Sequence, residues 1–209
     1  MNIIITGASS GIGKATYELL KKEHNVIGIS RNGPDIKLDL SITENIKNLA
    51  NLVNTQLDIL INNVGIAYVK SLEKSEISEI EEQISINLKS AILVTKVLLE
   101  KINQNGLIIN IGSIASKFGF DNWSVYSATK FGIGGFSHSL RKELSKKGIR
   151  VCLVMPGAVW TPIWEKNGFK KTQDMLTPED IAMVIKHIIN MPNYVNIDEI
   201  VITHVKRAY

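Results

Sequence analysis

The chain of 209 residues has one cysteine, no long apolar run and little excess charge. A lone cysteine cannot form an internal disulfide, which fits a reducing compartment, and we expect a cytoplasmic protein. Cys152 lies within an apolar run, so we expect it to be a buried core residue. No run approaches the roughly 18 apolar residues that indicate a membrane span, and the N-terminal residues lack the basic start and apolar core of a secretion signal. We expect no membrane contact.

Basic side chains exceed acidic ones by little. There are 24 Lys and Arg against 20 Asp and Glu, which leaves a formal charge of +4. This excess is too small and too dispersed to predict binding to nucleic acid. The four histidines show no ligand spacing with one another or with Cys152, so we predict no metal site.

Short β-branched apolar runs alternate along the chain with longer helical stretches, which predicts a parallel sheet with helices on both faces. The length fits one domain, residues 1–209. The predicted strands are Asn2–Thr6, Asn25–Ser30, Ile36–Asp39, Asp58–Ile61, Gly106–Gly112, Gly148–Met155 and Glu199–Thr203, and the predicted helices span about 11–23, 43–55, 76–103, 124–147 and 178–190. The expected fold class is therefore α/β, a doubly wound parallel sheet of about seven strands.

The link between the second and third predicted strands is short. Only four residues, from Asn32 to Asp35, separate Arg31 from Ile36. Four residues span at most about 14 Å, and a helical crossover needs a dozen or more residues. We therefore expect that the crossover helix is missing here and that the third strand is short.

A glycine-rich turn follows the first predicted strand and precedes a helical stretch; it reads Thr6-Gly7-Ala8-Ser9-Ser10-Gly11-Ile12-Gly13. Glycines in this setting allow a sharp turn, a close backbone approach to a pyrophosphate and close packing of the helix on the sheet. The N–H groups of the first helical turn would then face the anion. The alternative is a tight turn that binds nothing. We favour nucleotide binding, because the turn has the strand and the helix that confirm such motifs.

Further motifs follow in a fixed order: Asn62-Asn63-Val64-Gly65, Asn87, Ser113, Tyr126-Ser127-Ala128-Thr129-Lys130, Pro156-Gly157 and Thr161. With Thr-Gly-x-x-x-Gly-x-Gly at the start, this series resembles the short-chain dehydrogenase/reductase family from Thr6 to about Val201. Val64 stands where that family usually has alanine. The resemblance implies a Rossmann-type fold and an oxidoreductase that moves hydride between a nicotinamide cofactor and a carbonyl or secondary alcohol.

The resemblance implies a catalytic tetrad of Asn87, Ser113, Tyr126 and Lys130. Tyr126 would act as general acid and base, Ser113 would steady the substrate oxygen, and Lys130 would bind the nicotinamide ribose and lower the pKa of Tyr126. Asn87 would hold the helix geometry and a water that leads to Lys130. On spacing alone, a helix-surface pair is the favoured interpretation of Tyr126 and Lys130; the position of Ser113 at the end of a strand shifts the balance towards a site, with Ser116 as its rival.

The family pattern also implies which residues contact the cofactor. The expected contacts are Gly7, Ser9, Ser10, Gly11, Ile12, Gly13, Arg31, Asp39, Leu40, Asn63, Val64, Gly65, Tyr126, Lys130, Pro156, Gly157, Val159 and Thr161. Ser30 stands where NAD-preferring members carry Asp, and Arg31 follows with a planar group suited to a phosphate. NADP is therefore the expected cofactor, with NAD as the alternative.

The segment 158–177 is expected to cover the substrate. Its apolar side chains, with Trp123 ahead of Tyr126, line a partly apolar pocket or pack on the domain's own surface; they are Trp160, Ile163, Trp164, Phe169 and Met175. The resemblance also implies a homodimer or homotetramer formed through the 76–103 and 124–147 helices, where Gly132, Gly134 and Gly135 would permit close approach.

Two other functions compete with an NADP-dependent oxidoreductase. A catalytically silent NADP(H)-binding redox sensor would keep the glycine turn but typically lose the Tyr–Lys pair, which is present here. A nucleotide-sugar epimerase or dehydratase needs a larger C-terminal region than the roughly fifty residues that follow Pro156.

Overall fold

A computed structural model describes residues 1–206 of the chain. Its centre is a parallel sheet of seven strands in the order β3-β2-β1-β4-β5-β6-β7, so the predicted α/β class is confirmed. The strands are β1 (Asn2–Thr6), β2 (Asn25–Ser30), β3 (Ile36–Lys37), β4 (Leu57–Asn62), β5 (Ile102–Ile111), β6 (Arg150–Pro156) and β7 (Glu199–Ile202). The strand order reverses beside β1, between β1 and β4, which is where ligands bind in folds of this type.

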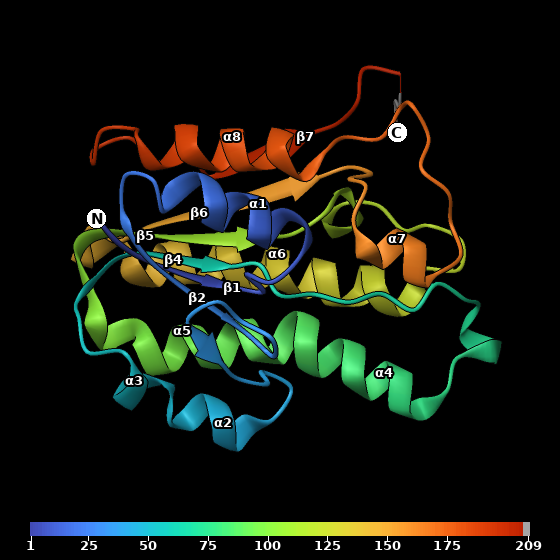
Figure 1. Cartoon of the computed structure of the whole chain (residues 1–209), viewed down its shortest axis with the longest axis horizontal. Coiled ribbons are helices and arrows are strands. Elements are labelled where there is room, and N and C mark those ends of the chain that lie inside the picture. Colours follow the sequence, from blue (N-terminus) through green and yellow to red (C-terminus); the bar gives the residue numbers. More distant parts are fainter. Residues whose placement is uncertain (207–209) are drawn as a thin grey trace.

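Helices cover both faces of the sheet (Figure 1). The helices are α1 (Gly11–Leu20), α2 (Thr43–Lys47), α3 (Leu49–Leu52), α4 (Ile77–Ile84), α5 (Ser90–Leu98), α6 (Ser124–Leu144), α7 (Pro162–Lys166) and α8 (Pro178–Ile189). α1 and α8 enclose one apolar core with the sheet, and α2, α3, α5 and α6 enclose a second core on the opposite face. No helix within residues 1–206 is long and apolar enough to cross a membrane.

The central strands are apolar because both of their faces are covered. Ile3, Ile4 and Ile5 are all almost fully buried, and they contribute alternately to the two cores. Cys152 is likewise buried within β6, as its apolar neighbours predict. This two-sided burial explains why these strands read as continuous apolar runs and not as alternating ones.

The link from β2 to β3 is a turn without a helix, as its length predicts. Gly33 N donates to Ser30 O at 3.1 Å, and Asp35 accepts a bond of 2.7 Å from Gly28 N. β3 consists of only two residues. The short link is therefore hydrogen-bonded to β2, and the carboxyl end of β2 lies next to the cleft described below.

Several element boundaries differ from the sequence prediction. The expected 76–103 helix is α4 and α5 joined by a π-helical turn at Ser85–Lys89, with a 3-10 turn at Leu99–Lys101. β5 starts at Ile102, before the predicted Gly106, because Ile102 pairs with Leu57 ahead of a register shift. The 43–55 stretch forms two short helices, and α7 was not predicted. Strand pairing and irregular turns of this kind depend on distant residues and leave no local pattern.

Candidate active site

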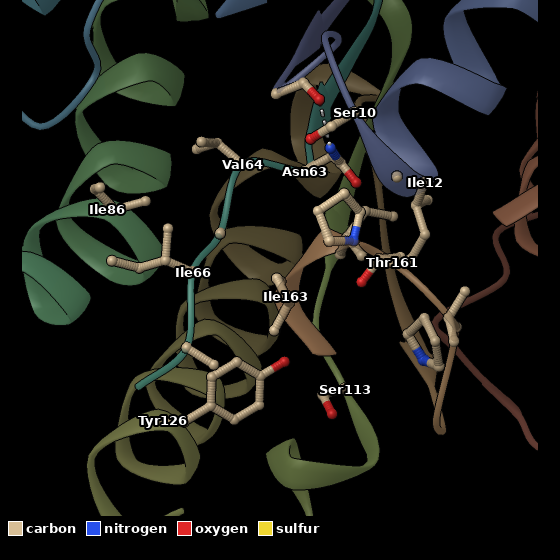
Figure 2. Close-up of a pocket in the computed structure, with 18 of the residues that line it drawn as sticks. Ser10, Ile12, Asn63, Val64, Ile66, Ile86, Ser113, Tyr126, Thr161 and Ile163 are labelled. Atoms are coloured by element: carbon tan, nitrogen blue, oxygen red, sulfur yellow. Dashed lines mark hydrogen bonds between the residues drawn. The ribbon is translucent and has the colours of Figure 1, made fainter. Parts of the chain in front are cut away.

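A cleft of about 1010 Å³ opens at the carboxyl ends of the central strands. It is lined by the glycine-rich turn, by the segment that follows β4, by the end of β5, by the start of α6 and by the segment that follows β6. Figure 2 shows Ser10 and Ile12 at one end of the cleft and Tyr126 and Ser113 at the other. Residues far apart in sequence thus meet at the sheet edge where parallel-sheet enzymes bind their ligands.

The glycine-rich turn has the geometry of an anion site. Gly7 and Gly11 have φ of +72° and +52°, which L side chains rarely adopt. A Cβ at Gly13 would overlap the carbonyl oxygen of Gly7, so α1 lies as close to the turn as the chain permits. α1 starts without a side-chain hydrogen bond from Ser10, so the first N–H groups of the helix could bind an anion.

Thr6 and Asn63 join the glycine-rich turn to the segment after β4. The Thr6 hydroxyl accepts bonds from the amides of Asn63 and Val64 at 3.0 and 3.2 Å, and Asn63 Nδ2 donates to Thr6 O at 3.0 Å. Sequence reasoning placed Asn63 at the cofactor but gave Thr6 no role. In the structure Thr6 fixes two walls of the cleft relative to each other.

Asn87 lies in the π-helical turn and is buried. Its side chain accepts a bond from Ile66 N at 2.8 Å and donates to Ile66 O at 2.9 Å. It also donates to the Thr129 hydroxyl at 3.2 Å, and that hydroxyl in turn donates to Tyr126 O at 2.7 Å. Asn87 therefore ties the segment after β4 to the turn of α6 that carries the Tyr–Lys pair.

Tyr126 and Lys130 occupy one face of α6, and both line the cleft. Lys130 Nζ donates to Ile111 O at 3.0 Å and lies 5.6 Å from the centre of the Tyr126 ring. Ser113 faces the same space from the end of β5 (Figure 2). Ser116, the rival, instead points back to the chain, where its hydroxyl accepts a bond from Ser113 N at 3.3 Å.

Burial governs the proton affinities of the pair. It raises the pKa of Tyr126 to about 12, although the Ser113 hydroxyl lowers it in part. Burial also lowers the pKa of Lys130 to about 8. The expected lowering of the Tyr126 pKa by Lys130 is therefore not found in this structure, where burial dominates and only the Ser113 hydroxyl lowers the pKa. Sequence spacing carries no information on burial.

The end of the cleft next to β2 is lined by polar side chains and by the basic side chain of Arg31. Ser30, Arg31, Asp39 and Leu40 all line it. Ser30 Oγ is buried without a hydrogen-bond partner among the described residues. Burial raises the pKa of Asp39, but hydrogen bonds from Ser41 and the nearby charge of Arg31 outweigh this and hold it below its usual value. An unpaired hydroxyl beside an exposed arginine fits a ligand that carries hydroxyl and phosphate groups.

The other expected contacts also fall on the cleft. Gly7, Ser9, Ser10, Gly11, Ile12, Asn63, Val64, Gly65, Pro156, Gly157, Val159 and Thr161 line it with the residues already named. Gly13 does not line it and acts through the packing of α1. No group of three or more His, Cys, Asp or Glu side chains within residues 1–206 is arranged to hold a metal ion.

Aromatic side chains form one wall beside Tyr126. The Trp123 ring lies 5.2 Å from the Tyr126 ring and 5.5 Å from the Trp164 ring, and Trp164 lies 5.2 Å from Phe169. Ile163 and Trp164 line the cleft as expected, but Trp160, Phe169 and Met175 do not. Trp160 lines a smaller hollow beside α1, and Met175 is buried. The apolar pattern could not tell the two faces of this segment apart.

Several residues around the cleft escaped sequence reasoning, and three of them make side-chain hydrogen bonds. Tyr68 and Glu82 line it and share a short hydrogen bond, and Asn167 lines it at the end of α7. None of them belongs to a motif quoted above. An asparagine one residue beyond a five-residue helix gives no local signal of its distant partners.

Comparisons with known proteins agree with this geometry. The family profile described as short chain dehydrogenase matches residues 35–172. Carbonyl reductase family member 4 from Xenopus laevis is 33% identical, with 90% of each chain covered. The closed form of serine dehydrogenase complexed with NADP+ superposes with a TM-score of 0.89 at 27% identity and covers 100% of this chain and 97% of the other.

A further solved structure, 4-hydroxyisoleucine dehydrogenase complexed with NADH, gives a TM-score of 0.82 at 27% identity, with 97% of this chain and 96% of the other covered. The profile spans well over half of the chain, and the relatives span nearly all of it. The chain therefore belongs to the short-chain dehydrogenase family and is an oxidoreductase of that family.

Proposed function

We propose that this protein interconverts a carbonyl and a secondary alcohol, with NADP(H) as cofactor and Tyr126 as the group that donates and accepts the proton. The observation that carries the proposal is the meeting of Ser113, Tyr126 and Lys130 in the same cleft as the glycine-rich turn. The phenol of Tyr126, the hydroxyl of Ser113 and the ammonium of Lys130 lie at one end of the cleft, and the glycine-rich turn lies at the other. This arrangement suits a dinucleotide that extends along the cleft.

The nicotinamide, when bound, supplies or accepts the hydride. The chain's own residues manage the oxygen: Ser113 donates a hydrogen bond to it, and the Tyr126 hydroxyl delivers its proton as the carbonyl becomes an alcohol. Lys130, held by Ile111 O, has its ammonium group near the phenol and would bind the nicotinamide ribose. In the reverse direction the Tyr126 phenolate takes the proton, and we assign to the charge of Lys130 the task of offsetting the burial that raises the pKa of the phenol.

NADP is favoured over NAD by the end of the cleft next to β2. Arg31 is exposed there beside the unpaired Ser30 hydroxyl, and the short link to β3 leaves this edge open. A planar guanidinium suits the extra phosphate of NADP. The serine dehydrogenase relative is complexed with NADP+, whereas the 4-hydroxyisoleucine dehydrogenase is complexed with NADH, so NAD(H) is the alternative to test.

The substrate is a small carbonyl or alcohol with an apolar part. Ile163, Trp164, Trp123 and Phe120 line the cleft near Tyr126, and the 158–177 segment supplies the first two. We assign this segment the role of covering the substrate within one domain of residues 1–209. We assign the protein to the cytoplasm, because its lone cysteine fits a reducing compartment. We propose no membrane or nucleic-acid partner, because the chain has no long apolar run and little excess charge.

Turnover of NADPH with a panel of ketones, aldehydes, quinones and 3-oxoacyl thioesters tests the proposal. We expect oxidation of NADPH, followed at its nicotinamide absorbance, with at least one class of carbonyl and with none in the absence of a carbonyl. Tight NADPH binding without turnover of any compound would favour the redox-sensor alternative.

A further inference from the structure

Asn167 connects α7 to a segment about a hundred residues earlier in the chain. Its Oδ1 accepts a bond from Val69 N at 2.8 Å, and its Nδ2 donates to Ala67 O at 2.9 Å. The same Nδ2 also donates to Ile163 O at 2.8 Å, within its own helix. One side-chain amide thus joins the end of α7 to the segment that follows β4, and both of these segments line the cleft.

The segment that Asn167 reaches, which we call the β4 loop (residues 66–70), is attached to α4 and its π-helical extension by separate bonds. Asn87 makes two hydrogen bonds with Ile66, the residue next to Ala67. Buried Gln83 accepts a bond from Tyr68 N at 3.3 Å, and Lys70 pairs with Glu79 at 2.8 Å. Asn87 and Asn167 therefore bind adjacent peptide groups of one loop from two different elements.

The other side of α7 rests on the start of α6. Trp164 packs on Trp123, which itself packs on the ring of Tyr126. Ile163, between these two attachments, points into the cleft above Tyr126 (Figure 2). α7 thus crosses the cleft, with an apolar attachment at one side and the Asn167 hydrogen bonds at the other.

We propose that Asn167 is a positioning residue for the reaction. Its bonds to Ala67 and Val69 hold α7 over the cleft and fix it to the β4 loop, which Asn87 also binds. The helix that covers the substrate therefore keeps a fixed position relative to the β4 loop. This rests on the proposed function. A role in ending α7 would need only the bond to Ile163 O and the Asn167 backbone N–H, which bonds to Trp164 and Glu165. The bonds to the loop have no part in that role.

Two variants and one control separate these roles. Asn167→Ala removes all three side-chain bonds, and Asn167→Asp keeps the acceptor for Val69 N but loses both donors. Glu165→Ala changes an exposed side chain of the same helix that does not line the cleft. Each is assayed with NADPH and the carbonyl that reacts fastest in the panel above, and hydrogen exchange at the Val69 amide is measured with NADPH bound.

We expect KM for the carbonyl to rise about tenfold in Asn167→Ala and less in Asn167→Asp, with kcat changed less than about twofold, because the bonds position groups and do no chemistry. Exchange at Val69 should quicken about tenfold, and Glu165→Ala should match the wild type. Unchanged exchange at Val69, or faster exchange with unchanged KM, would overturn the proposal. If the wild type reduces no carbonyl, the proposed function fails. The role of Asn167 is then decided by the rate of exchange at Val69 and by the NADPH dissociation constant, both of which should rise in Asn167→Ala.

Discussion

At the scale of residues, the cleft brings together two ionisable groups on which burial has opposite effects. It raises the pKa of Tyr126 and lowers that of Lys130, so each neutral form is favoured. Lys130 is nevertheless held by the carbonyl oxygen of Ile111, which keeps its ammonium group directed at the catalytic end of the cleft. Because burying this charge costs free energy, the stability of the fold should depend on pH in a way that can be measured.

The free energy of unfolding should carry the signature of Lys130. Its pKa falls from 10.5 to about 8 on folding, so between these values the unfolded chain binds more protons and stability rises with pH. In Lys130→Met this contribution is absent. Urea unfolding between about pH 7.5 and 9.5 should show the wild type gaining stability relative to the variant as pH rises. If the free energies of unfolding of the wild type and the variant change in parallel with pH, Lys130 is not desolvated.

Arg31 should decide the choice of nicotinamide cofactor. In Arg31→Ala we expect the dissociation constant of NADPH to rise at least tenfold, because a charge-assisted pair with phosphate is lost, and that of NADH to change little. Both constants can be measured by titration of tryptophan fluorescence. Lys37→Ala is the matched control, because it removes an exposed positive charge of β3 that does not line the cleft. Tighter binding of NADH than of NADPH to the wild type would refute the assignment.

At the scale of elements, the first turn of α1 depends on its closeness to the glycine-rich turn. Gly13→Ala should abolish NADPH binding and destabilise the fold, because the new methyl group would meet the Gly7 carbonyl oxygen and Asn63. Gly119→Ala is the control, since a Cβ there has nothing within 4 Å. Thermal unfolding with and without NADPH measures both effects. An equal gain in Tm from NADPH in Gly13→Ala and the wild type would contradict the account.

The sequence predicted elements well where one local cause decides them. Continuous apolar runs identified the buried strands, and the four residues before Ile36 excluded a crossover helix. The predicted 178–190 helix is α8, whose start is fixed locally by a capping box between Thr177 and Asp180. The π-helical turn around Asn87 and the early start of β5 were missed, because they depend on contacts with residues far along the chain.

The site divides in the same way. Motif residues such as Ser113 and Tyr126 could be placed from the sequence, since each follows a strand or starts a helix of predictable position. The raised pKa of Tyr126, the role of Thr6 and the bonds of Asn167 could not, because burial and long-range hydrogen bonds are set only when the chain folds. Which side of the 158–177 segment faces the cleft was likewise open, and half of the expected wall lies elsewhere.

At the scale of the whole molecule, the helices that carry the site also present an apolar outer surface. Ile84, Ile92 and Phe131 are exposed on α4, α5 and α6. Of the three glycines expected at the contact, only Gly135 faces open space, since Gly132 and Gly134 face side chains of their own chain. Exposed apolar residues on adjoining helices favour contact with another subunit. This supports the expected homodimer or homotetramer through these helices.

Light scattering at micromolar concentration should give a multiple of the 23.2 kDa chain mass for the wild type. Phe131→Glu should shift the mass toward the monomer, because a carboxylate would be buried in the contact. Tyr194→Glu, at an exposed position beyond α8, should leave the mass unchanged. A monomeric wild type would contradict the proposed contact between subunits through these helices.

The central claim, that Tyr126 moves the proton, is tested most directly by NADPH oxidation in Tyr126→Phe. The variant keeps the ring packed on Trp123 and removes only the hydroxyl. We predict a loss of kcat of at least a thousandfold, with the NADPH dissociation constant within about threefold of the wild-type value, because the glycine-rich turn and Arg31 are untouched. Turnover by the variant within tenfold of the wild type would contradict the account.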